Sequence, residues 1–164
     1  MVRESKILVA GGTGFIGSHL IADLISRDNQ VVSISKNINK KYIKEKNVKY
    51  IHHDLSKKLE ISQIKLLEEV EYIINCSGYI NHGDFFNKGN DIFNQHFNSL
   101  YSLTKLGMDL GVKAFVNLGS SDEYGITNSP IKESVRESPA SPYALGKLAS
   151  THYLQQCFNN NLLN

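Results

Sequence analysis

Short runs of apolar residues alternate with longer stretches of helical periodicity along this chain of 164 residues. The apolar runs predict strands at residues 6–10, 30–35, 48–52, 71–76 and 112–118, and the periodic stretches predict helices at residues 18–27, 61–70, 91–110 and 143–159. Strands that alternate with helices are typical of a parallel sheet wrapped by helices. The pattern therefore predicts an α/β fold, a doubly wound parallel sheet of about five strands.

A glycine-rich run, GGTGFIG at residues 11–17, lies between the first predicted strand and the first predicted helix. Gly11 permits a tight turn, Gly14 lets the backbone approach phosphates, and Gly17 lets the helix pack close to the strand. The helix N-terminus then presents free N–H groups to an anion. A Rossmann-type dinucleotide site is favoured over a plain structural turn, and its predicted contacts are Gly11, Thr13, Gly14, Phe15, Ile16 and Gly17.

Composition narrows the possible partners and the compartment. The formal net charge is +2 and there is no basic block, so nucleic acid is not favoured as a partner. No apolar run approaches membrane-spanning length, and residues 1–10 lead into a core strand, so we expect neither a membrane partner nor a signal sequence. Cys76 and Cys157 are too few and too isolated for a disulfide framework, so we expect two free thiols in a reducing cytoplasm. The six histidines show no metal-binding spacing, and no metal is expected.

A second group of chemistry-bearing residues follows the fifth predicted strand. Tyr143 and Lys147 lie one helical turn apart on the same face, where a nearby ammonium favours the phenolate and suits a general base. Taken alone, this pair is no more than an amphipathic helix face. The hydroxyls of Ser120 and Ser121 follow the fifth strand at the carboxyl edge of the sheet, where open α/β sheets bind ligands.

With these residues in place, the sequence resembles the extended short-chain dehydrogenase/reductase family, the NAD-dependent epimerases and dehydratases of nucleotide sugars. The resemblance covers essentially the whole chain. It rests on six motifs: GGTGFIG at 11–17, His53-Asp54-Leu55, Asn75-Cys76-Ser77-Gly78, Asn98, the run GSSDEYG at 119–125, and Ser141-Pro142-Tyr143 with Lys147.

The resemblance implies roles for individual residues. Tyr143 is similar to the catalytic base that removes a proton from a sugar hydroxyl, and Lys147 would lower its pKa and bind the nicotinamide ribose. Ser120 matches the catalytic Ser/Thr, with Ser121 as its competitor. The cofactor would also contact Asp54 and Leu55 at adenine and Cys76, Ser77 and Gly78 near its ribose, while Asn98 matches an asparagine that is structural in relatives.

The cofactor itself is NAD or NADP on this reading. NAD-preferring relatives place an acidic residue at the end of the second strand, where it binds the ribose 2′-hydroxyl. This chain has Ser35 there, followed by Lys36. A hydroxyl and a cation suit a 2′-phosphate, so the sequence favours NADP.

The resemblance leaves the reaction open between epimerisation and dehydration. Asp122 stands where dehydratases of the family carry an acid, but an aspartate just after a strand more often forms a turn, and that role is favoured. An NADPH-dependent keto-sugar reductase and a non-catalytic dinucleotide-binding module are the alternatives. Tyr79, His82 and the loop to Asn90 are further candidates for substrate contacts, with a solvated loop favoured.

Members of the family normally continue past this point, with a sixth strand and a smaller C-terminal domain that holds the nucleotide sugar. We therefore expect residues 1–164 to be one NAD(P)-binding domain that lacks the substrate domain, as a split reading frame, a fragment or a small stand-alone protein. The fifth strand would then form an open sheet edge. The resemblance also implies a homodimer through a four-helix bundle of helices 91–110 and 143–159.

Overall fold

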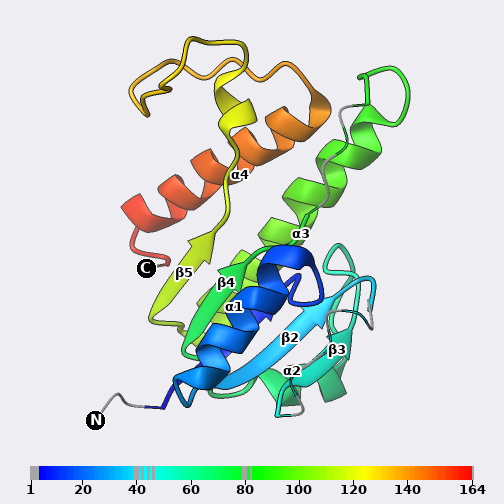
Figure 1. Ribbon diagram of the computed structural model, residues 1–164, viewed down its shortest axis with the longest axis vertical. Helices are drawn as coiled ribbons and strands as arrows, with labels where there is room; N and C mark the ends of the chain where they lie inside the picture. The colour runs from blue at the N-terminus through cyan, green and yellow to red at the C-terminus, as the bar shows by residue number, and fades with distance from the viewer. Residues whose placement is uncertain are drawn as a thin grey trace.

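The computed structural model describes residues 4–38, 41, 43, 45, 47–78, 81 and 83–163. Five strands form one parallel sheet in the order β3-β2-β1-β4-β5, as Figure 1 shows. Their bounds are β1 (Lys6–Ala10), β2 (Gln30–Ser35), β3 (Lys49–His52), β4 (Tyr72–Asn75) and β5 (Ala114–Asn117). The strand order changes direction at β1, which is the arrangement of a doubly wound sheet. The predicted fold class is confirmed.

Helices cover both faces of the sheet. α1 (Phe15–Ser26) packs on one face, and α2 (Ile61–Leu67), α3 (Gly89–Leu110) and α4 (Pro142–Asn159) lie on the other, as the two opposite views show. Alternate residues of β1 therefore belong to different cores. Ile7 and Val9 pack with Ile21 of α1, whereas Leu8 and Ala10 pack with the cluster that includes Leu67, Leu103 and Cys157. This two-sided burial explains why β1 is a continuous apolar run.

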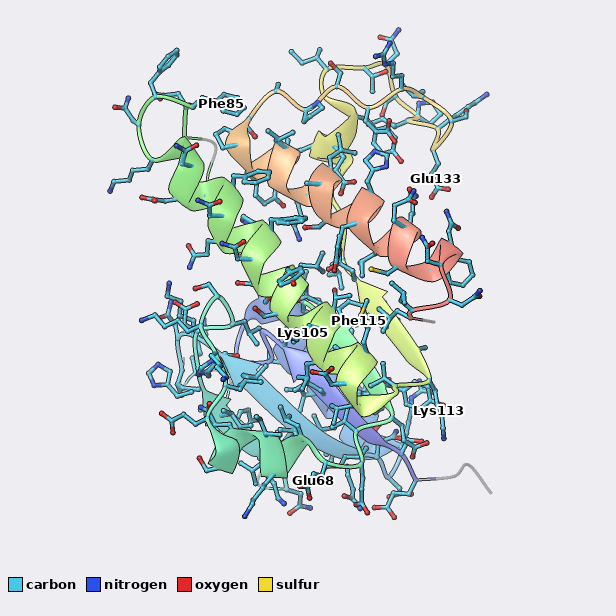
Figure 2. All side chains as sticks on the ribbon, turned by 180° about the vertical axis from the view of Figure 1, so that it is seen from behind. Glu68, Phe85, Lys105, Lys113, Phe115 and Glu133 are labelled. Carbon is cyan, nitrogen blue, oxygen red and sulfur yellow. The ribbon has the colours of Figure 1, made fainter. Side chains whose placement is uncertain are left out.

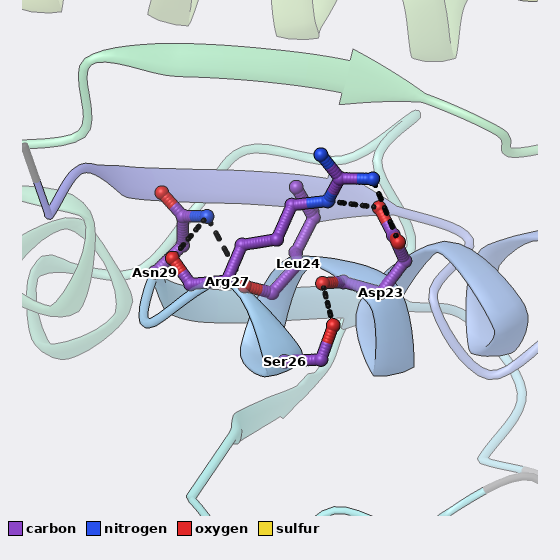
Figure 3. A network of polar contacts seen from close by, with 5 residues as sticks. All are labelled: Asp23, Leu24, Ser26, Arg27 and Asn29. Carbon is purple, nitrogen blue, oxygen red and sulfur yellow. Dashed lines mark hydrogen bonds and ion pairs between the residues drawn. The ribbon is translucent and has the colours of Figure 1, made fainter. Parts of the chain in front are cut away.

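The ends of α1 follow from local chemistry. Gly14 is the N-cap in an extended conformation, so the helix begins at Phe15, directly after the glycine turn and three residues earlier than predicted. At the C-terminal end, Arg27 donates to both carboxylate oxygens of Asp23, and Asn29 Nδ2 donates to the Leu24 carbonyl (Figure 3). These contacts give hydrogen-bond partners to the Leu24 carbonyl and to the charged side chains of Asp23 and Arg27 at the end of the helix.

The predicted helix 61–70 and the predicted strand 112–118 exceed the observed elements the most, by three residues each. The predicted helix 61–70 ends at Leu67, because Glu68 is extended and Glu69 has a φ of 65°, which turns the chain so that Val70 reaches the core. The predicted strand 112–118 begins at Ala114. Val112 belongs instead to the end of α3, where its N–H donates to the Gly107 carbonyl beside the left-handed C-cap Gly111.

β5 lies at one edge of the sheet, and among the described residues it pairs only with β4. Val116 at this edge is half exposed, and Phe115, which Figure 2 labels, lies beside Leu154 and Phe158 of α4 around a shallow depression. The expected open edge is therefore present in the described part of the chain. Lys113, just before β5, forms an ion pair with Glu71.

Candidate dinucleotide and catalytic site

A pocket of about 600 Å³ opens at the carboxyl ends of the strands. Each of the four strands β1 to β4 delivers the turn that follows it to this edge, and α3 forms the remaining wall. Ten of the residues predicted to bind the cofactor line it: Gly11, Thr13, Gly14, Ser35, Lys36, Asp54, Leu55, Cys76, Ser77 and Gly78. This is the position at which open α/β sheets bind ligands.

The glycine turn has the geometry that its sequence predicts. Gly11 has a φ of 76°, a conformation that other residues rarely adopt, and its N–H donates to the Ile34 carbonyl at 2.8 Å. A Cβ on Gly17 would lie 2.4 Å from the Gly11 carbonyl oxygen and 2.7 Å from Gly12 Cα. Only glycine therefore allows α1 to begin so close to β1. The first-turn N–H groups of α1 point outward at the turn, where an anion is stabilised.

Thr13 ties this turn to the end of β2. Its N–H donates to Ser35 Oγ at 3.3 Å, and its own hydroxyl donates to the Asn37 carbonyl at 2.7 Å. Thr13 and Ser35 are both buried. The hydroxyl of Ser35 is thus already an acceptor within the chain.

Lys36 and Asp54 form an ion pair in the pocket wall, with 2.9 Å between Nζ and Oδ2. The other carboxylate oxygen accepts from the N–H and the hydroxyl of Ser56, at 3.1 and 2.8 Å. Burial alone would raise the pKa of Asp54, but the hydrogen bonds from Lys36 and Ser56 outweigh it and lower the pKa to about 2. Asp54 is therefore a carboxylate at neutral pH.

The side chain of Asn75, the buried last residue of β4, holds the turn that follows this strand. Asn75 Oδ1 accepts from the N–H of Ser77 at 3.0 Å and from its hydroxyl at 2.5 Å, while Asn75 Nδ2 donates to Asn117 on β5. Burial raises the pKa of the Cys76 thiol, and this effect exceeds that of the nearby Lys147 ammonium, which lowers the pKa. Gly78 has a φ of 137°, and a Cβ there would lie 3.0 Å from His96 Cε1.

Tyr143 and Lys147 lie beside the pocket rather than in its wall. Ser141 caps α4 by accepting from the Ala144 N–H, and Pro142 occupies the first turn, which starts the helix just before Tyr143. Lys147 is buried and donates to the Leu118 carbonyl at 2.9 Å, and its Nζ would be 3.8 Å from a Cβ on Gly78. Burial lowers the pKa of this ammonium, although the nearby Glu123 and Cys76 act in the opposite direction and raise it. The Tyr143 ring meets the His96 ring edge-on, 5.1 Å between centroids.

Ser120 is joined to α4 through a buried glutamate. Its hydroxyl caps the short 3₁₀ helix η2 (Ser121–Tyr124) by accepting from the Asp122 N–H at 3.2 Å. Glu123 Oε1 accepts from the Ser120 N–H at 2.8 Å, and Oε2 accepts from the Thr151 hydroxyl at 2.8 Å. Glu123 is 5% exposed, whereas Ser121 is exposed. One carboxylate therefore connects the end of β5 to the helix of Tyr143.

Several site features differ from the sequence prediction. Phe15 and Ile16 are exposed by 68% and 54% and do not line the pocket, and neither does Gly17. Asn98 is exposed on α3. The α3 residues in the pocket wall are Gln95, His96 and Ser99, and the other unpredicted lining residues are Ile34, Asn37 and His53. The helical period from the buried Ile92 to Leu100 could have indicated His96, since it places that residue on the buried face.

The remaining predictions concern metals, membranes and one loop. No cluster of three or more potential metal ligands occurs among the described residues. Within the same residues, no helix is long and apolar enough to span a bilayer. Tyr79 and His82, the candidate substrate contacts, lie outside the residues that the structure describes.

Comparison with known proteins gives a consistent picture. The model of the NAD dependent epimerase/dehydratase family matches residues 7–163. The UDP-glucose 4-epimerase of Lactobacillus helveticus is 27% identical over 146 residues, which are 87% of this chain and 44% of that protein. The UDP-N-acetylglucosamine 4-epimerase from Methanobrevibacter ruminantium, in complex with UDP-N-acetylmuramic acid, has a TM-score of 0.87 and 25% identity over 99% of this chain and 53% of its own. The UDP-glucose 4-epimerase of Thermus thermophilus, in complex with NAD, has a TM-score of 0.80 and 24% identity over 96% and 52%. The chain thus spans about half the length of these relatives.

Proposed function

We propose that this chain, which belongs to the NAD dependent epimerase/dehydratase family, binds NAD or NADP and carries the proton-transfer residues of a nucleotide-sugar epimerase or dehydratase. The observation that carries the proposal is the position of Lys147, whose ammonium lies next to Gly78 at one end of the pocket, one helical turn from Tyr143. The glycine turn after β1, between the turns that follow β2 and β4, supplies the bare backbone that a pyrophosphate needs. The residues present therefore fit a dinucleotide.

Each residue has a distinct role in this proposal. Tyr143 removes the proton from a sugar hydroxyl, since its phenol is buried one turn from an ammonium. Lys147, oriented by the Leu118 carbonyl, stabilises the phenolate and binds the cofactor ribose. Ser120 donates to the reacting sugar oxygen, because its hydroxyl proton is not used by the bond it accepts from Asp122. The bound dinucleotide supplies the hydride acceptor.

The cofactor-binding half of the proposal can be tested on this chain directly. Titration calorimetry with NAD and NADP should give saturable binding of at least one of them. The pocket is open to solvent and its backbone cradle is preformed, so we expect no requirement for a partner. A chain that folds, as judged by circular dichroism, but binds neither dinucleotide would contradict the proposal.

The catalytic half is tested by adding UDP-glucose to the NAD complex and following absorbance of reduced cofactor near 340 nm. The sugar nucleotide is chosen because the relatives named above act on UDP-sugars. We expect reduction of bound cofactor, with return to the oxidised form whether the reaction is an epimerisation or a dehydration. Stoichiometric consumption of NADPH with a keto-sugar would indicate a reductase. Dinucleotide binding without any reaction would favour the alternative, a non-catalytic binding module.

We also propose that α3 and α4 form a homodimer interface by pairing with a second copy as a four-helix bundle. The two helices pack against each other through the rings of Phe97, Tyr101 and Tyr153. Tyr101 remains 48% exposed, which leaves apolar surface on the outer side of the pair. Sedimentation equilibrium should give twice the monomer mass of 18.4 kDa, and a monomer at all concentrations would exclude this interface.

A further inference from the structure

The loop that carries Ser120 is held at two backbone atoms by charged side chains. The carbonyl of Leu118 accepts from the Lys147 ammonium at 2.9 Å. The Ser120 N–H donates to Glu123 Oε1 at 2.8 Å. Gly119 lies between these two backbone atoms, and a Cβ on it would lie 2.9 Å from Glu123 Oε1. A lysine on one side of Gly119 and a glutamate on the other therefore fix the backbone of this loop.

Glu123 and Lys147 are also buried charges. Glu123 is 5% exposed and Lys147 is 8% exposed, and no other aspartate, glutamate, lysine or arginine is buried in the part of the chain that the structure describes. A buried charge is costly unless it is hydrogen-bonded and lies near the opposite charge. Glu123 Oε2 accepts from the Thr151 hydroxyl at 2.8 Å, and Thr151 lies one helical turn after Lys147 on the same face of α4. The carboxylate therefore binds α4 one turn from the ammonium.

These contacts of Glu123 go beyond those of a helix cap. A capping box requires only that the third residue of the helix accept from the N–H of the N-cap. In η2 that contact is made by Oε1 alone. The second oxygen contacts another helix, and the whole side chain is buried. Glu123 is therefore placed to act on α4 as well as on its own turn.

The groups that face Lys147 come from all the elements around it. Burial lowers the pKa of Lys147, whereas Glu123 of η2 and Cys76 of the turn after β4 raise it. His96 of α3 lies beside the same turn after β4 as the Lys147 ammonium, and Tyr143 precedes the lysine by one turn of α4. Burial raises the pKa of the Cys76 thiol, so this thiol is uncharged at neutral pH. The negative charge that stabilises the ammonium at neutral pH is therefore that of Glu123.

We propose that Glu123 is a positioning residue for the proposed reaction, because one buried carboxylate fixes the backbone of Ser120 and is the counter-charge of Lys147. The inference rests on the proposed function, in which Ser120 donates to the sugar oxygen and Lys147 stabilises the phenolate of Tyr143. Glu123 does not line the pocket, so it acts on the reaction only through Ser120 and Lys147.

Glu123→Gln removes the charge and can keep both hydrogen bonds. The amide oxygen can accept from the Ser120 N–H, and the amide NH₂ can donate to Thr151 Oγ. The carboxylate favours the ammonium form of Lys147, so its loss lets the neutral amine form at lower pH. We expect the titration midpoint of Lys147, measured by heteronuclear NMR of the lysine side chain, to fall by about one pH unit. The alkaline limb of the pH profile for cofactor reduction should move down by the same amount, because the reaction requires the ammonium.

Thr151→Val is the complementary variant, because it keeps the charge and removes the hydrogen bond to Oε2. It should leave the titration midpoint of Lys147 unchanged. Hydrogen exchange of the Ser120 N–H should become about fivefold faster, since its acceptor is no longer held by α4. Glu123→Gln should change this exchange rate less than about twofold, because the acceptor remains.

A matched control for the charge is available at the surface of α4. Glu137→Gln removes a carboxylate that lies 3.7 Å from His152, the residue after Thr151, and it should change neither the midpoint of Lys147 nor the exchange of the Ser120 N–H.

A Ser120 N–H that exchanges without protection in the wild-type chain would overturn the inference whether or not the variants fold. So would an unchanged midpoint of Lys147 in Glu123→Gln, or an alkaline limb that stays in place while this midpoint falls. The NMR and exchange measurements need no dinucleotide. A wild-type chain that binds neither NAD nor NADP would therefore overturn the proposed function, and that result is distinct from a failure of the Glu123 contacts.

Discussion

Tyr143→Phe should lower the rate of cofactor reduction by the sugar nucleotide about 10³-fold and leave NAD binding within about threefold of wild type. The substitution removes the phenolate oxygen that would accept the proton but keeps the ring that meets His96 edge-on. The lysine next to Gly78 stays in place because Leu118 orients it independently of the tyrosine. Single-turnover absorbance near 340 nm measures the rate, and calorimetry measures the binding.

Tyr153→Phe is the matched control for this variant. Tyr153 lies on the same helix, and its ring packs against Phe97 and Tyr101 on the side of α4 that faces α3. Its rate of cofactor reduction should be unchanged, which separates loss of the base from general damage to α4. Wild-type rates in Tyr143→Phe would remove Tyr143 from the proposed chemistry. A loss of NAD binding in that variant would point to a structural role for the hydroxyl.

Gly17→Ala should destabilise the chain by about 2–3 kcal/mol and raise the dissociation constant for NAD by about 100-fold or more. The new Cβ would lie 2.4 Å from the Gly11 carbonyl oxygen and 2.7 Å from Gly12 Cα. Both contacts are with backbone, so the start of α1 must move away from the turn. That movement withdraws the first-turn N–H groups from the position of a pyrophosphate. Urea unfolding gives the free energy and calorimetry gives the affinity.

Gly111→Ala separates the effect on binding from the effect on stability. Gly111 has a φ of 62° at the C-cap of α3, but no atom lies within 4 Å of a Cβ placed there. The variant should therefore cost about 1 kcal/mol of backbone strain and leave NAD binding unchanged. If Gly17→Ala bound NAD like the wild-type chain, the glycine turn would not be the pyrophosphate site.

The parts of this molecule that the sequence predicts are those decided by neighbours in the chain. The strand ends at Ala10 and Ser35 and the need for glycine at positions 11 and 17 follow from local patterns, and the structure has them where expected. The end of α2 could not be predicted in this way, because Glu69 adopts a left-handed conformation that is unusual for a glutamate.

The features that sequence reasoning misses are contacts between distant segments. The sequence suggests a free cation at Lys36, because nothing near it in the chain indicates that Asp54 lies beside it. The resemblance singles out Asn98 on this helix, whereas the residue in the pocket wall is His96, on the buried side of α3. The role of Glu123 depends on Thr151 in α4, which the sheet and the intervening segment bring to it. The place of such a residue in its helix or strand can be predicted from the sequence. Whether its side chain is paired or available to a ligand depends on contacts that only the tertiary structure shows.

The Glu123 bridge has a mechanical consequence. The spacing between the serine and the tyrosine is not set by the sheet alone, because one carboxylate binds the Ser120 backbone with one oxygen and the Thr151 hydroxyl with the other. Thr151 lies about two helical turns beyond Tyr143 on α4. We therefore expect a tilt of α4 on the sheet to displace the loop that carries Ser120 as well. The distance between the proposed serine and tyrosine would then be kept while their position relative to the rest of the sheet changes.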